Sequence, residues 1–151
     1  MKTIASFTVN HDTLDKGMYI SRIDGDVVTY DIRMKKPNGG DYLPTPAAHT
    51  IEHLFATYAR NTAEQDSIIY VGPMGCRTGF YFLTRNDILG ERAIEIVRET
   101  MDFIINFEGD IPGNTSRECG NYLEHDLEGA KAIATDMKAV LKSWKTADLQ
   151  Y

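Results

Sequence analysis

The segment His49-Thr50-Ile51-Glu52-His53 constrains the fold more than any other stretch of this chain. Two histidines four residues apart can bind one cation only if the segment is helical, because a helix places residues i and i+4 on one face. The flanking sequence favours a helix, with Thr45 as its N-cap and Pro46 as its first helical residue. We therefore predict a helix from about Pro46 to about Glu64 whose face is open to further ligands.

On this helix His49, Glu52 and His53 share one stripe, so two imidazoles can meet one cation with a carboxylate beside it. This spacing, H-x-x-E-H, is the pattern of the inverted zincins. The alternative is a chance pair of hydrogen-bonded core histidines, since a motif is a hypothesis until its structural context is known. The rest of the chain has to supply that context.

A third protein ligand would make the site catalytic in type, because catalytic zinc-like sites use three protein ligands and keep one position open. The candidates are His11, His125, Cys76 and Cys119. Cys119 is the best on chemical grounds, since a thiolate binds a borderline cation tightly and Gly120 lets the backbone approach closely. An inert buried thiol is the alternative interpretation.

Cys76 and Glu52 are candidates for proton transfer. Cys76 lies in a tight loop between Gly75 and Arg77, where a guanidinium and exposed backbone N–H groups favour the thiolate. Glu52, beside a Lewis-acidic metal, is a natural general base. The alternatives are a packed thiol and a solvated glutamate.

Arg33 follows Asp31 by one strand step, so the two side chains share a face. They form either a surface ion pair worth under about 1 kcal/mol or an oriented donor for a substrate carboxylate or sugar hydroxyl. The sequence leaves this choice open.

Hydrophobic periodicity predicts an α+β fold with an antiparallel sheet. Strands come mostly first and helices later, with too few strand-helix alternations for a doubly wound sheet. Asp24-Gly25 predicts a hairpin turn. The predicted strands cover residues 5–9, 18–23, 27–34, 67–71 and 78–84, and the later helices are expected to begin near Asn86 or Asp87 and at Asp126.

Composition restricts the partners of the protein. The 151 residues, 42% of them hydrophobic, suit one domain, residues 1–151. A net charge of -6 without a basic run argues against nucleic acid or an anionic membrane as partner. The absence of a secretory h-region or an apolar run near ~20 residues predicts a cytoplasmic protein. A reducing compartment predicts that Cys76 and Cys119 are separate thiols.

Several separate motifs together resemble the S-ribosylhomocysteine lyase family, LuxS. They are His49–Leu54, Gly72–Tyr81, Cys119-Gly120 and His125–Lys131. The similarity covers nearly the full length, beginning at Ser6-Phe7 and His11 and continuing through Asp31–Arg33. The chain departs from the family pattern just before Gly72, at the stretch expected to contact the homocysteine end of the substrate.

The resemblance implies a homodimer of α+β subunits, each with a four-stranded antiparallel sheet, and active sites at the subunit interface. It implies one metal per subunit, Fe(II) in cells, which Zn or Co can replace. Part of the substrate-binding set is expected to come across the interface. The implied site residues are His49, His53 and Cys119 for the metal, Glu52 and Cys76 for proton transfer, and Ser6, His11 and Arg33 for substrate binding.

The implied reaction splits the thioether of S-ribosylhomocysteine into homocysteine and 4,5-dihydroxy-2,3-pentanedione, the precursor of autoinducer-2. Moving the sugar carbonyl along the chain makes the proton beside the carbon-sulfur bond acidic, and β-elimination then expels homocysteine. Each carbonyl shift needs a Lewis acid on oxygen and bases on both faces of an enediolate. A metal, Glu52 and Cys76 supply that set.

Two other functions use some of the same residues. An inverted-zincin metallopeptidase would use Glu52 to activate water, would normally take a carboxylate as third ligand, and would not need Cys76. A structural metal domain would favour a closed four-ligand site without an acidic residue beside it. The lyase explains more of the motifs than either alternative.

Overall fold

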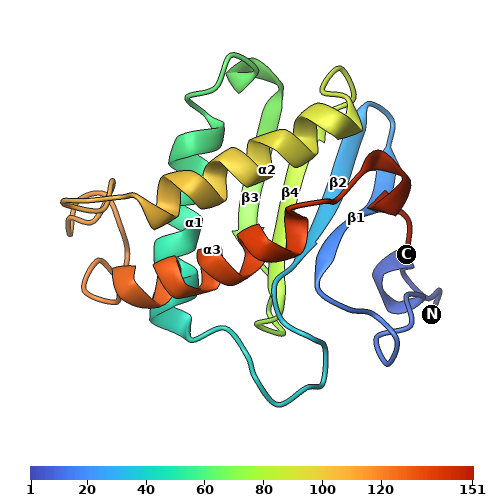
Figure 1. Ribbon diagram of the computed structural model, residues 1–151, viewed down its shortest axis with the longest axis horizontal. Coiled ribbons are helices and arrows are strands. Elements are labelled where there is room, and N and C mark those ends of the chain that lie inside the picture. Colours follow the sequence, from blue (N-terminus) through green and yellow to red (C-terminus); the bar gives the residue numbers. More distant parts are fainter.

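The computed structural model describes residues 1–151 and consists of one four-stranded sheet with three helices on one face (Figure 1). All strand pairs are antiparallel, in the order β1-β2-β4-β3. The predicted α+β class, the antiparallel sheet and its four strands are therefore confirmed. The strands are β1 (Gly17–Asp24), β2 (Val27–Arg33), β3 (Ile68–Pro73) and β4 (Gly79–Arg85), and the helices are α1 (Thr45–Ala59), α2 (Gly90–Ile105) and α3 (Leu127–Leu141).

The two faces of the sheet differ in what covers them. Strand β2 turns Val28, Tyr30 and Ile32 toward the helices, where all three are buried, as the alternation of the sequence predicts. Its other face carries Asp31 and Arg33. We call this second side, which no α-helix covers, the outer face of the sheet (Figure 1).

The predicted hairpin between β1 and β2 is confirmed. Its turn has Gly25 at φ 61°, a conformation that glycine adopts without strain at the first central position of a tight hairpin turn.

Helix α1 begins near the predicted residue but ends at Ala59 instead of Glu64. The side-chain amide of Asn61 donates to the backbone carbonyl of Thr57, and the side-chain hydroxyl of Thr62 donates to the backbone carbonyl of Ala59. Such side-chain bonds to the backbone compete with continued helix, so they explain the early end.

Only one predicted helix cap is confirmed. The carboxylate of Asp126 accepts the N–H of Gly129 at 2.9 Å, at the start of α3. Thr45 makes no capping bond, and α2 begins at Gly90, later than expected and also without a side-chain cap. Burial of their apolar faces holds these two helices in place.

The predicted first strand, residues 5–9, is wrong. Residues Ala5–Phe7 form a short 3-10 helix (η1), in which the hydroxyl of Thr8 donates to the carbonyl of Ala5 at 2.7 Å. Alternating apolar residues do not make a strand unless a sheet edge pairs with them. The N-terminal segment and the last 3-10 helix, Thr146–Leu149 (η3), lie at the β1 edge of the sheet (Figure 1).

None of the helices combines the length and the apolar character that spanning a membrane requires.

Candidate functional site

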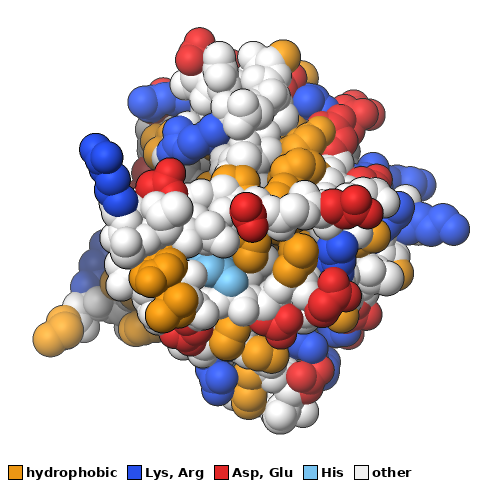
Figure 2. All heavy atoms as spheres, turned by 90° about the vertical axis from the view of Figure 1, so that its left-hand side faces the viewer, with side chains coloured by type: hydrophobic (Ala, Val, Ile, Leu, Met, Phe, Trp, Pro, Cys, Tyr) orange, Lys and Arg blue, Asp and Glu red, His pale blue; other side chains and the backbone are white.

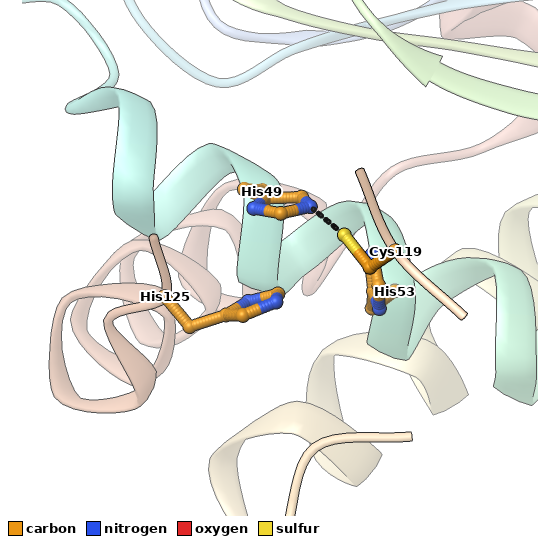
Figure 3. A group of neighbouring side chains, drawn as sticks. All are labelled: His49, His53, Cys119 and His125. Carbon is orange, nitrogen blue, oxygen red and sulfur yellow. Dashed lines mark hydrogen bonds between the residues drawn. The ribbon is translucent and has the colours of Figure 1, made fainter. Parts of the chain in front are cut away.

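Four side chains bring their ligand atoms together, each within 4.8 Å of the others (Figure 3). We call His49, His53, Cys119 and His125 the donor group. Helix α1 supplies the first two, and the loop of residues 106–126, between α2 and α3, supplies the other two. The predicted helical pairing of His49 with His53 is confirmed, with ring centroids 4.7 Å apart.

Backbone carbonyls of the 106–126 loop orient both α1 histidines. Nδ1 of His49 lies 2.7 Å from the carbonyl oxygen of Glu124, and Nδ1 of His53 lies 2.8 Å from that of Pro112. Because a carbonyl only accepts, each Nδ1 carries the proton and each Nε2 keeps a lone pair. This is the outer hydrogen bonding that metal-binding histidines use.

A glycine shapes the same loop. Gly113, next to Pro112, has φ 74°, and a Cβ there would lie only 3.4 Å from Nδ1 of His53. The loop can therefore approach His53 closely at this point.

The tautomer of His125 follows from the hydrogen bonds of Thr50. The Thr50 hydroxyl donates to the carbonyl of Pro46 at 3.1 Å and accepts the N–H of Asp126 at 2.9 Å. Its single proton is thus used, so the 3.0 Å contact with Nδ1 of His125 is a bond that the imidazole donates. Nε2 of His125 then carries a lone pair, and this atom is buried without a partner.

The donor group fits a divalent cation. Burial lowers the pKa of His125, and the neighbouring His49 and His53 lower it further, which favours the neutral ring. Cys119 Sγ lies 3.4 Å from Nε2 of His49 and accepts the N–H of Asn121 at 3.5 Å. Three imidazole lone pairs and a thiol therefore converge, and neutral imidazole with thiolate is a set that binds borderline metal ions.

Glu52 and His49 line one side of a hollow of about 360 Å³. The end of β3, at Pro73, and the β3–β4 loop, at Met74 and Arg77, also line it. Figure 2, which faces the left-hand side of Figure 1, shows histidine atoms at the surface of the molecule. Glu52 thus lies in the same hollow as His49, whereas Cys76 does not line it.

Cys76 belongs to a second cluster, with Asp31, Arg33 and Thr78, which we call the arginine cluster. Arg33 pairs with Asp31 through two contacts, Nε–Oδ1 at 3.1 Å and Nη2–Oδ2 at 2.5 Å, and donates from Nη1 to the Thr78 hydroxyl at 2.6 Å. Cys76 Sγ lies 3.0 Å from that hydroxyl and 3.9 Å from Nη1. Neither cysteine is in a disulfide, as predicted.

Of the two alternatives that the sequence left open for Arg33, the structure excludes the surface ion pair, because the side chains of Arg33 and Asp31 are only 3% and 1% exposed. Burial acts to lower the pKa of Arg33, but the hydrogen bond and charge of Asp31 outweigh it and raise this pKa above its ordinary value. The sequence did not predict the contact of Tyr151 with this pair. The Tyr151 hydroxyl donates to Oδ2 of Asp31 at 2.8 Å, and its ring stacks on that of Tyr19 with centroids 5.1 Å apart.

The structure leaves two predicted substrate-binding residues apart from both clusters. Ser6 lines another hollow, of about 410 Å³, together with Tyr81 and Leu83 of the outer face. Nδ1 of His11 lies 2.9 Å from the carbonyl oxygen of Val9, and this histidine is not in the donor group. Within one chain, neither side chain forms a hydrogen bond to the donor group or the arginine cluster.

A family model described as S-Ribosylhomocysteinase (LuxS) matches residues 4–148. This chain belongs to the LuxS family. A LuxS relative from Phocaeicola vulgatus, named S-ribosylhomocysteine lyase, is 52% identical in an alignment that covers 87% of this chain and 84% of the relative. A relative of the same name from Clostridium acetobutylicum is 45% identical and covers 100% of this chain and 99% of its own length. A third, from Porphyromonas gingivalis, is 49% identical over 87% of this chain and 86% of its own length.

The LuxS resemblance that the motifs indicated is confirmed by these matches. His125 is the residue that sequence reasoning undervalued, since it was weighed only as an alternative to Cys119. The structure brings both into one group. Their position six residues apart in one loop was the available signal.

Proposed function

We propose that this LuxS chain is a metal-dependent carbon-sulfur lyase that cleaves S-ribosylhomocysteine to homocysteine and 4,5-dihydroxy-2,3-pentanedione, the autoinducer-2 precursor. The observation that carries the proposal is the convergence of His49, His53 and Cys119 beside Glu52, in a chain of this family. The same reaction returns homocysteine to the methyl cycle. Residues 1–151 act as one lyase domain.

His49, His53 and Cys119 hold the metal, which we propose to be Fe(II), one per subunit, with Zn or Co as substitutes. Helix α1 then presents its histidines as in the inverted zincins. A set of two imidazoles and one thiolate suits these ions and leaves room for substrate. When bound, the ion polarises a sugar oxygen and so makes the neighbouring C–H proton more acidic.

Glu52 and Cys76 move protons during the two carbonyl shifts and the β-elimination. Glu52 faces the hollow beside His49, where a sugar can bind. The Thr78 hydroxyl, 3.0 Å from Cys76 Sγ, and Nη1 of Arg33, 3.9 Å from it, hold this thiol in place. Arg33 also binds substrate in this proposal, as do Ser6 and His11.

We further propose a homodimer with active sites at the subunit interface. Arg33 belongs to the outer face of the sheet, whereas the donor group lies between α1 and the 106–126 loop. No helix covers the outer face, and Tyr70 and Phe7 beside it are 51% and 75% exposed. A second copy packed there would bring Cys76, Arg33, Ser6 and His11 of one chain toward the metal of the other.

Two observations favour the lyase over a metallopeptidase. The donor group contains a thiol and no carboxylate, whereas a peptidase site of this helix type would take a carboxylate as third ligand. The buried arginine cluster also holds Cys76 in a way that peptide hydrolysis does not need. We place the enzyme in the cytoplasm, where both thiols stay reduced.

Thiol release from S-ribosylhomocysteine tests the function directly. Protein purified and metal-loaded without oxygen is mixed with the substrate, and free thiol is titrated over time. We expect one homocysteine per substrate consumed and loss of turnover after chelation. Metal-loaded protein that releases no thiol would overturn the proposal.

A further inference from the structure

Thr50 lies inside the H-x-x-E-H segment, at a position to which the motif assigns no role. It is fully buried, and its one hydroxyl takes part in three hydrogen bonds. One bond stays within α1, at the carbonyl of Pro46, and the other two go to His125 and Asp126 of the 106–126 loop. Thr50 therefore ties the loop that supplies half of the donor group to the helix that supplies the other half.

The bond from His125 has a second effect. Because Nδ1 donates its proton to Thr50, the neutral ring has a lone pair at Nε2. That atom is the one buried side-chain nitrogen or oxygen in the structure that has no hydrogen-bond partner. It faces the other three donors of the group (Figure 3).

The ring of His125 lies against that of His49 with centroids 4.1 Å apart and an angle of 18° between the planes. The ligand atom of His125 lies within 4.8 Å of those of the other three donors. A lone pair at Nε2 would therefore attract a cation held by those donors. An N–H at the same position would repel the ion.

We propose that Thr50 is a positioning residue of the metal centre, which latches the 106–126 loop onto α1 and fixes the His125 tautomer so that a lone pair faces the ion. This inference rests on the metal centre of the proposed function. Without the Thr50 hydroxyl, Nδ1 of His125 loses its acceptor. The ring then places its proton on Nε2, where the three other donors can accept it and where it opposes cation binding.

Cobalt binding tests this inference without relying on turnover. Co(II) affinity is measured by chelator competition for the wild type, Thr50→Val and Thr50→Ser, and the thiolate-to-cobalt absorption band reports the bond to Cys119. We expect Thr50→Val to weaken Co(II) binding by about 10- to 100-fold, the range found for such outer-shell changes. Thr50→Ser keeps the hydroxyl and should bind within about threefold of the wild type, and all three should show the band when saturated. Wild-type affinity in Thr50→Val would overturn the inference.

A double-mutant cycle with His125→Phe separates the two parts of the proposal. The phenyl ring preserves the stack on His49 but has neither the lone pair nor the Nδ1 proton. If Thr50 acts through His125, Thr50→Val should cost little further affinity in the His125→Phe background. An equal loss in both backgrounds would overturn the tautomer mechanism.

Thr50→Val is informative only if it is folded, which a cooperative unfolding transition shows. If it is not, His125→Phe is tested alone, since this variant should also weaken Co(II) binding about tenfold. Unchanged affinity in that variant would overturn the inference. A wild type that binds Co(II) but releases no thiol would overturn the proposed function and leave this inference standing.

Discussion

Hydrogen bonds order both the donor group and the arginine cluster, but the two regions differ in their charge balance. The donor group consists of half-buried side chains whose outer N–H groups are satisfied by backbone carbonyls and one hydroxyl, so that lone pairs converge. The arginine cluster consists of buried opposite charges that satisfy each other. A cation from outside would stabilise the first arrangement, whereas the second is balanced without one.

This difference explains how the two regions divide the work in our proposal. Converging lone pairs make a site for an ion that activates substrate, and a balanced ion pair makes a rigid support for Cys76. In the homodimer that we propose, the substrate meets both regions at the subunit interface. The following predictions test this division, from the largest expected effect to the smallest.

Cys119→Ala and Cys76→Ala should separate the two regions most strongly. Cys119→Ala removes the one sulfur donor, so we expect metal content to fall from about one ion per chain to near zero, with loss of turnover. Cys76→Ala should lose turnover but keep its metal. Metal analysis after desalting and thiol release measure both effects. If both variants kept metal and turnover, the division between the two thiols would be wrong.

A mixture of two inactive variants tests whether the regions meet across an interface. Glu52→Gln and Cys76→Ala are unfolded together and refolded as a mixed population. If each site takes Glu52 and Cys76 from different chains, half of the dimers are mixed and each has one intact site, so about a quarter of wild-type activity should return. Sites built within one chain would recover none.

Asp31→Asn should destabilise the fold strongly, because it leaves the buried Arg33 without its counter-charge. We expect the free energy of unfolding to fall by about 3–5 kcal/mol, measured by urea denaturation. The matched control is Asp24→Asn, which breaks the exposed pair with Arg22 and should leave the unfolding midpoint unchanged. Equal midpoints for the two variants would contradict the buried pairing of Arg33.

In the metal-free protein, the contribution of His125 to the free energy of unfolding should decrease gradually as the pH falls. The folded-state pKa of His125 lies below its ordinary value of 6.5, so the unfolded chain binds more protons as the pH falls through that value. The contribution of His125 to stability is therefore present above pH 6.5 and is lost as the pH falls toward the folded-state pKa, by at most about 1.4 kcal/mol per pH unit.

Unfolding free energies of the metal-free wild type and His125→Phe, compared at several pH values, isolate this term. The variant should show the shallower dependence on pH below 6.5. Parallel curves would contradict the lowered pKa of His125.

Local features of the sequence determined much of the fold and half of the site. The i, i+4 spacing of His49 and His53 needs only a helix to bring the two rings together, and the alternation in β2 needs only a neighbouring strand. The hairpin at Gly25 and the Asp126 cap depend on residues a few positions apart. Features of this kind are legible in a sequence because their partners are close along the chain.

Tertiary structure alone decided the features whose partners are distant in sequence. Thr50 binds His125 and Asp126, Arg33 meets Thr78, and no local pattern announces either contact. The burial of the Arg33 charge and the partnerless Nε2 of His125 likewise follow from packing. The sequence by itself determined which ligands α1 presents; only the folded chain, by placing one loop against that helix, decided which lone pairs face the metal centre.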